Sequence, residues 1–301
     1  MSRLYVILNV FADRPLAGNP LAVVLDAQGL DAGGMQAIAR EFNLSETVFL
    51  LPAEDEARKA RLRIFTPERE LPFAGHPTVG TAALLGLMDA AAGKGRLHAF
   101  ELEEPVGALP CDVEVLDRRR AFASFALARL PQPAGEARAP EAIAAALGLD
   151  PDDIGFDGHA PSRFEAGNPF TFVPLKSCDA LARAVLRHDL WDAGFGGEGR
   201  PSAYLYARGE AGSGFAFRAR MLRPGLGEDP ATGSAVAALA GAIMAFEPPA
   251  DGAHAIRVGQ GDEIGRPSVI ELGLKVRGGA LASATIGGFA VVAAEGSLFV
   301  K

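Results

Sequence analysis

Two glycine-rich segments of the chain carry side chains that can bind an acid and move a proton. The first reads PFAGHPTVGTAALLG over residues 72–86 and contains His76. The second reads EDPATGSAVAALAG over residues 228–241 and contains Asp229. An imidazole and a carboxylate are common general acids and bases, because modest environmental shifts bring their pKa values near the working pH. The simpler alternatives are that His76 caps a helix and that Asp229 is an ordinary helix N-cap.

Each segment leads from a predicted strand into a run of small apolar residues that favours a helix. A helix start has N–H groups without partners and a partial positive charge, so it can bind a carboxylate or a phosphate. Gly75, Gly80 and Gly233 would let the main chain approach such a ligand closely. Nearby hydroxyl groups would add donors; they belong to Thr78, Thr81, Thr232 and Ser234. We therefore expect a site for a small carboxylic acid, with plain capped helices as the alternative.

Glu46 is a third candidate for proton transfer. It follows Ser45 in FNLSETVFL, residues 42–50, at the start of a predicted apolar strand. A carboxyl that is partly buried at a strand end beside a pocket is suited to act as a general base. The alternative is an exposed glutamate at a strand edge that binds only local backbone groups.

Composition and charge exclude several classes of function. The chain has 301 residues, of which 49% are hydrophobic and 22% charged, as in ordinary globular proteins. Its net charge of −8 argues against nucleic acid or an anionic membrane as a partner. No uninterrupted apolar run approaches the roughly 18 residues of a membrane-spanning helix, and the first 20 residues do not resemble a signal peptide. We expect a cytoplasmic protein.

Neither a metal nor a cofactor is expected. Cys111 and Cys178 are too few for a disulfide framework or a four-cysteine zinc site, and the five histidines are scattered. No P-loop follows either glycine-rich segment, and no GxGxxG opens a helix in the dinucleotide-binding arrangement. We interpret the glycine-rich GFGGEG, residues 194–199, as a loop.

The elements that must position these residues are predicted from local patterns. Alternating, β-branched and aromatic runs predict strands at 3–12, 18–26, 46–53, 60–67, 97–103 and 111–116. Helical spacing predicts helices at 31–43 and 141–150 and from the first glycine-rich segment to about Met88. Residues 128–140 are rich in Pro, Ala and Gly and are predicted to be a linker. The order of elements favours an α+β unit.

The chain contains an internal repeat. AGNPLAVVL at 17–25 matches AGNPFTFVPL at 166–175, and HPTVGTA at 76–82 matches DPATGSA at 229–235. In both matches the second segment follows the first by nearly the same number of residues, which predicts two similar domains from a duplication. If the domains pack about a pseudo-twofold axis, His76 and Asp229 would both face the cleft between them.

These motifs resemble those of a known family. FADRPLAGNPLAVV, EFNLSETVF, RIFTPERELPFAGHPTVGTA and EDPATGSA are similar to segments of the PhzF-like phenazine-biosynthesis family. QGDEIGRPS at 260–268 and IGGFAVV at 286–292 are similar to its closing section. The resemblance extends over nearly the whole chain.

The resemblance implies a fold like that of diaminopimelate epimerase. This fold has two similar, pseudo-symmetric α+β domains, each a mixed barrel-like sheet around a central helix. The N-terminal domain would comprise 1–129 together with a returning strand at about 287–301, and the C-terminal domain 130–286. The active site would lie in the interdomain cleft.

The resemblance also implies an activity. The characterised family member isomerises trans-2,3-dihydro-3-hydroxyanthranilate by moving a proton between ring carbons, without cofactor or metal, as a homodimer. By motif match, Glu46 corresponds to the general acid/base, and His76, Asp229 and Ser234 to residues around the substrate. Gly75 and Gly233 would place backbone close to its carboxylate.

The sequence therefore predicts a cofactor-independent isomerase of a small carboxylic acid. One alternative is an amino-acid racemase or epimerase of the same fold. Enzymes of that kind that use two thiols have a cysteine in each glycine-rich turn, and neither turn of this chain has one. The other alternative is a non-catalytic protein that binds a small acid.

Overall fold

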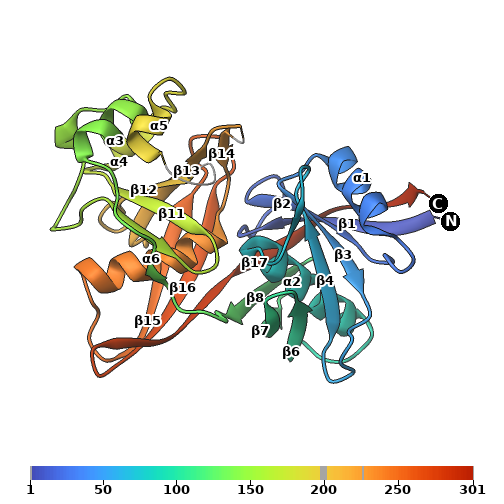
Figure 1. Cartoon of the computed structure of the whole chain (residues 1–301). Helices are drawn as coiled ribbons and strands as arrows, with labels where there is room; N and C mark the ends of the chain where they lie inside the picture. Colours follow the sequence, from blue (N-terminus) through green and yellow to red (C-terminus); the bar gives the residue numbers. More distant parts are fainter. Residues whose placement is uncertain (1, 197–201, 226, 301) are drawn as a thin grey trace. The chain divides into compact units, whose positions relative to one another are not determined.

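The computed structural model describes residues 2–196, 202–225 and 227–300. The chain divides into two compact units, which are described separately (Figure 1). Unit 1 comprises Met1–Ala128 and Ile286–Lys301, and unit 2 comprises Arg129–Thr285. None of the helices in the described part of the chain is both long and apolar enough to cross a membrane.

Unit 1 contains a closed barrel. Its strands are β1 (Ser2–Val10), β2 (Asn19–Val24), β3 (Glu46–Leu51), β4 (Ala60–Phe65), β5 (Glu70–Leu71), β6 (Leu97–Glu104), β7 (Gly107–Val115), β8 (Arg120–Ala126) and the later part of β17 (Ala280–Phe299). β2 pairs with β3 and β4 with β6 in parallel, whereas β1–β2, β3–β4, β6–β7 and β7–β8 are antiparallel. β17 pairs with both β1 and β8 and so closes a ring of eight strands, in which the short β5 takes no part.

The core of unit 1 is built around helix α2 (Gly75–Ala91). Every residue from Gly75 to Leu87 is buried, because the helix contacts strands on several sides of the barrel. A helix that is apolar all round needs such an enclosure. The strands supply it through alternation: every second residue of β7 from Leu109 onward is buried. Helix α1 (Ala32–Phe42) lies outside the barrel and packs Met35 and Ile38 on Phe49 and Phe65.

Unit 2 repeats this design. Its strands are β9 (Gln132–Pro133), β10 (Ser162–Glu165), β11 (Pro169–Pro174), β12 (Ser202–Arg208), β13 (Phe217–Arg223), β14 (Gly227–Asp229), β15 (Gly252–Gln260), β16 (Ser268–Arg277) and the first residues of β17. Its helices are α3 (Pro140–Leu147), η1 (Pro151–Asp153), α4 (Cys178–Arg183), α5 (Trp191–Phe195) and α6 (Gly233–Phe246). Helix α6 is buried from Ala235 to Ile243 and contacts β10, β11 and β16.

The two units share one order of strand pairing. In unit 1, β1 to β4, β6 and β7 pair antiparallel, parallel, antiparallel, parallel and antiparallel. In unit 2, β10 to β13, β15 and β16 pair in the same sequence of senses. The short strand β5 pairs with β4 in unit 1, and the short strand β14 pairs with β13 in unit 2. The predicted α+β fold, with two similar sheets each around a central helix, is therefore confirmed.

Two local predictions need correction. The predicted linker at 128–140 does begin at the boundary between the two units, but it contains β9, in which Pro133 pairs with Phe164, so part of this segment belongs to the sheet of unit 2. The predicted loop at 194–199 begins inside α5, since Gly194 packs so tightly on Ala142 and Ala146 that a Cβ there would lie 2.6 Å from Ala146. Residues 197–199 of that prediction lie outside the described residues.

Candidate active site

Glu46 is the first residue of β3, a strand paired on both sides. Helix α1 ends at Phe42, and Asn43 adopts the left-handed conformation that commonly ends a helix. The chain then enters β3 three residues later, with Glu46 level with Leu21 of β2. The Glu46 side chain is only 17% exposed. The alternative of an exposed glutamate at a strand edge is therefore wrong.

His76 lies in the first turn of α2, directly opposite Glu46. Its Nε2 is 3.5 Å from Oε2 of Glu46, and its side chain is 6% exposed. The residue that caps α2 is Ala74, so His76 is not a helix cap and that alternative is wrong as well. Residues 30 positions apart in sequence thus form one acid–base pair at the end of the central helix.

The imidazole of His76 is neutral at neutral pH. Burial lowers the pKa of His76 to about 3, because water is removed from the charged form. A neutral imidazole can both donate and accept a proton through its two ring nitrogens. The pair can therefore combine the carboxyl group of Glu46 with a neutral hydrogen-bonding partner.

In unit 2, Asp229 ends β14, four residues before Gly233, the first residue of α6. Its Oδ2 accepts a 2.6 Å hydrogen bond from Oγ1 of Thr232. Thr232, and not Asp229, is the N-cap residue of α6, so the reading of Asp229 as a simple N-cap is wrong. Gly233 and Ser234 are the first two residues of the helix, and Ser234 is the more exposed of the two.

Gln260 holds this turn in place, and the sequence reading missed it. Its Nε2 donates to the carbonyl of Asp229 at 2.8 Å and to Oγ1 of Thr232 at 3.0 Å. Its Oε1 accepts from the Thr232 amide at 3.1 Å and from the Tyr204 hydroxyl at 3.2 Å. The residue is fully buried. Gln260 is the first residue of the QGDEIGRPS segment that resembles the family, and this was the signal in the sequence that could have found it.

The structure changes how the two glycine-rich segments correspond. The sequence alignment pairs His76 with Asp229 and Gly80 with Gly233. However, α2 begins at Gly75 and α6 at Gly233, so these two glycines are the equivalent first residues. His76 then occupies the same helical position as Ser234. Asp229 lies before its helix and has no counterpart within α2.

Three predicted ligand contacts are also wrong. Gly80 lies inside α2, where a Cβ would come within 2.6 Å of Leu21 and of Val10, so the glycine permits close packing of helix on sheet. The hydroxyl of Thr78 is directed to the carbonyl of Ala74 and to Glu104. The hydroxyl of Thr232 is directed to Asp229.

Gly75, His76 and Ser234 remain candidates for binding at helix starts. Within the described residues, the N-cap side chains of α2 and α6 make no hydrogen bond to their helices. By contrast, Asp31 caps α1 and Ser177 caps α4 through side-chain oxygens. Like α3 and α5, the two central helices therefore begin without a hydrogen bond to the side chain of their own N-cap residue.

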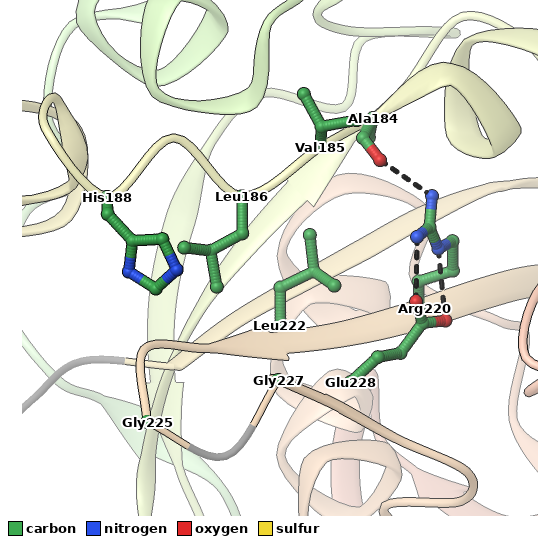
Figure 2. A pocket seen from close by; sticks show the side chains of 9 residues that line it. All are labelled: Ala184, Val185, Leu186, His188, Arg220, Leu222, Gly225, Gly227 and Glu228. Carbon is green, nitrogen blue, oxygen red and sulfur yellow. Dashed lines mark hydrogen bonds and ion pairs between the residues drawn. The ribbon is translucent and has the colours of Figure 1, made fainter.

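An open pocket of about 550 Å³ lies beside the strand that carries Asp229 (Figure 2). Arg220 and Glu228 line it and form a two-pronged ion pair with bonds of 3.0 and 2.7 Å. Nη1 of Arg220 also donates to the carbonyls of Leu181 and Ala184 at 2.8 Å. Because neighbouring residues of a strand face opposite ways, Glu228 fastens β14 on one side while Asp229 faces the start of α6.

Neither thiol belongs to a glycine-rich segment. Cys111 is buried in β7, and burial raises its pKa to about 12. Cys178 begins α4 and its Sγ donates to the carbonyl of Arg208 at 3.2 Å. Within residues 2–196, 202–225 and 227–300, no group of three or more His, Cys, Asp or Glu side chains could hold a metal ion.

Comparisons with known proteins agree on one family. The family model described as "Phenazine biosynthesis-like protein" matches residues 8–296. An uncharacterized isomerase of Mesorhizobium japonicum is 49% identical, with 99% of each chain covered. The trans-2,3-dihydro-3-hydroxyanthranilate isomerase of Pseudomonas aeruginosa is 35% identical, over 98% of this chain and 99% of its own. The crystal structure of a PhzF-family protein of Bacillus anthracis superposes with a TM-score of 0.85 at 25% identity, with both chains fully covered.

Proposed function

Because the chain belongs to the phenazine biosynthesis-like protein family and is an isomerase with the epimerase-like fold, we propose that it isomerises a small carboxylic acid by proton transfer, without a cofactor. The observation that carries this proposal is the 3.5 Å separation of Glu46 Oε2 and His76 Nε2 at the start of α2. This pair is a base and a hydrogen-bonding partner in a largely dry environment, which is what carbon acid chemistry requires.

Glu46 is the group that moves the proton. Its carboxylate takes a proton from a carbon of the substrate, and the electron pair of that C–H bond enters the conjugated system. The double bond shifts, and the carboxyl of Glu46 returns the proton to a second carbon. Atoms and electrons balance within the substrate, so no oxidant or reductant takes part. Neutral His76 keeps the carboxyl oriented and donates to the charge that develops.

The start of α6 supplies binding. We propose that the backbone of Gly233 and the hydroxyl of Ser234 bind the substrate carboxylate, with Gly75 performing the same role at α2. Asp229 takes part in the proton transfer. Its orientation is supported by the hydrogen bond from Thr232 and by the contacts of Gln260 with the same turn. A preorganised donor at such a site is typically worth about 10²- to 10³-fold in rate.

The first substrate to test is trans-2,3-dihydro-3-hydroxyanthranilate, the compound in the name of the relatives at 35–36% identity. The purified protein is incubated with this compound in D₂O and the reaction is followed by NMR. A shift of the double bond with deuterium at the new C–H position supports the proposal. Small amino acids are tested in parallel.

Two other outcomes of the same experiment would identify the alternative functions. Deuterium at a stereocentre of an amino acid, with no shift of a double bond, would instead identify a racemase or epimerase. Binding of an acid without solvent exchange into any compound would identify a non-catalytic binding protein. Either result contradicts the proposed isomerisation.

The quaternary state and location are part of the proposal. We propose a cytoplasmic homodimer that takes a small carboxylate and binds neither nucleic acid nor membrane. Light scattering on the purified protein measures its mass directly, against 31.3 kDa for one chain. Fractionation of the cells that make it measures the location. A monomer, or recovery with the membranes, contradicts the corresponding part.

A further inference from the structure

Glu104 is a buried acid that the proposed mechanism does not use. It is the last residue of β6 and only 3% exposed. Its Oε1 lies 2.7 Å from Oγ1 of Thr78, which is in the first turn of α2, two residues after His76. The same Oγ1 lies 2.8 Å from the carbonyl of Ala74, the N-cap residue of that helix.

These two short distances require two protons. The hydroxyl of Thr78 has one proton to donate, whereas a carbonyl and an ionised carboxylate both only accept. If Thr78 donates to Ala74, the short contact with Glu104 is a hydrogen bond only when Glu104 has a proton of its own. A protonated Glu104 donates to the lone pair of Thr78, and a continuous chain then runs from Glu104 through Thr78 to Ala74.

The surroundings of Glu104 favour its neutral form, because the side chain is buried. Within the described residues Glu104 forms no ion pair, and its Oε2 has no hydrogen-bond partner. Its neighbour Glu103 faces the other side of β6 and forms an ion pair with Arg58, with 3.3 Å between Oε2 of Glu103 and Nη1 of Arg58. On β7, Cys111 lies close enough to Glu104 that a negative charge on Glu104 would raise the pKa of the Cys111 thiol. On α2, His76 is neutral.

We propose that Glu104 is a positioning residue of the active site: as a neutral acid it donates to Thr78 and fixes the first turn of α2, which holds His76 against Glu46. This inference rests on the proposed function of the Glu46–His76 pair, but its central claim concerns the protein without substrate. Glu104 touches neither the substrate nor the reacting groups, since it acts through Thr78.

The consequence is an alkaline limit to activity. Burial raises the pKa of Glu104 to about 8, although a hydrogen bond that Thr78 donates to the ionised carboxylate lowers it in part. Above that pH the carboxylate needs the proton of Thr78, and the bond from Thr78 to Ala74 is lost. The first turn of α2 then loosens, and His76 moves relative to Glu46.

The test compares Glu104→Gln with wild type. Glutamine keeps the shape and remains neutral, so it can donate to Thr78 at every pH. The matched control is Glu103→Gln, which makes the same chemical change at the adjacent residue on the opposite face of the strand. The ring carbon and proton signals of His76 are followed by NMR from pH 6 to 9.5 in the protein without ligand.

We expect the His76 signals of wild type and of Glu103→Gln to shift with a midpoint near pH 8. His76 itself titrates far lower, so this shift reports a neighbour. We expect no such shift in Glu104→Gln. A shift that persists in Glu104→Gln, or that is absent from wild type, overturns the proposal.

Turnover gives a second readout. From pH 7 to pH 9, loss of one required proton with a pKa near 8 lowers the rate about tenfold. The rate of Glu104→Gln at pH 9 should stay within about twofold of its rate at pH 7. If wild type proves inactive on trans-2,3-dihydro-3-hydroxyanthranilate, the proposed substrate fails while the NMR titration still decides the role of Glu104.

A pair of variants at Thr78 covers the case in which Glu104→Gln does not fold. Thr78→Ser keeps the hydroxyl and should keep the His76 shift near pH 8. Thr78→Val removes the hydroxyl with little change of shape and should abolish that shift. Equal titrations of the two variants overturn the proposal.

Discussion

At the scale of single residues, proton transfer depends on Glu46. Replacing Glu46 with glutamine keeps its size and its contact distance to His76 but removes the base. We expect turnover to fall by about 10²- to 10⁴-fold, with substrate affinity nearly unchanged, because the lost interaction acts in the transition state. Steady-state kinetics on the substrate identified in D₂O measure both quantities.

The control for that variant is Glu41→Gln, which makes the same change on the exposed side of α1. It should retain wild-type kinetics. Full activity in Glu46→Gln would show that another group moves the proton.

A second prediction at this scale concerns stability and pH. The pKa of Glu104 is about 8 in the folded protein, against an ordinary value of 4.5. Between these values the folded state holds a proton that the unfolded state has released. The free energy of unfolding therefore falls as pH rises, by about 1.4 kcal/mol per pH unit from this group.

Glu104→Gln has no such dependence, so it should gain stability relative to wild type as pH rises from 5 to 8. Urea unfolding of both proteins at several pH values measures the difference. A difference that stays constant over this range would show that Glu104 is ionised in the folded state, contrary to the proton count.

What the sequence could predict about single residues was their type more than their partners. Glu46 and His76 were found from their motifs, but their 3.5 Å contact depends on the register of β2 with β3 and on where α2 begins. Gln260 and Glu104 were missed because their partners are 26 to 31 residues away. The adjacent acids Glu103 and Glu104 did indicate a buried acid, because neighbouring residues of a strand point to opposite faces of the sheet.

At the scale of elements, both central helices depend on glycines that face a sheet. A Cβ on Gly80 would lie 2.6 Å from Leu21 and from Val10, and one on Gly241 would lie 2.4 Å from the ring of Phe164. These contacts are too close for real Cβ atoms, so the helix or the strand would have to shift. The glycine-rich segments thus serve packing as well as the helix start, which the sequence alone did not separate.

We expect Gly80→Ala to lower the free energy of unfolding by about 1–3 kcal/mol through overpacking. The control is Gly33→Ala in exposed α1, where the new Cβ would meet only Asp31 at an ordinary 3.5 Å. That change should be neutral or stabilise by up to about 1 kcal/mol, since alanine favours a helix. Thermal or urea unfolding measures both, and equal effects would contradict the packing role of Gly80.

The start of each central helix was the least predictable feature of the elements. HPTVGTA and DPATGSA align well as sequences, yet the first is helical from before its histidine and the second only from its glycine. Pro77 is tolerated inside the first turn of α2 because the first N–H groups of a helix need no internal partner. The alignment could not show this, because the sequence alone does not fix the residue at which each helix begins.

At the scale of the whole molecule, the repeat seen in two short motifs extends to the order and sense of strand pairing. Patterns within the sequence predicted the duplication, whereas the strand that closes the first barrel was expected only from the family resemblance. That closure depends on pairs such as Ser2 with Phe299 and Val10 with Ala290. Local patterns contain no information about which distant strands become neighbours.

The division into units makes a prediction about hydrogen exchange. Gly80→Ala should speed amide exchange in α2, in β1 to β8 and in residues 286–299 of β17, because all of these belong to unit 1. Exchange in α6 and β15 should change little. Mass spectrometry of exchanged peptides measures this, and equal acceleration in both units would show that they unfold as one.

The long strand β17 also has a consequence for synthesis on the ribosome. Its first residues follow β16, whereas residues from Ile286 onward complete the barrel of unit 1. The first barrel therefore waits, open between β1 and β8, until the whole of unit 2 has been made. During that interval two unpaired strand edges are exposed to other chains. Nascent protein is thus most exposed to misassembly when translation pauses shortly before the C-terminus, and chaperone demand should be greatest there.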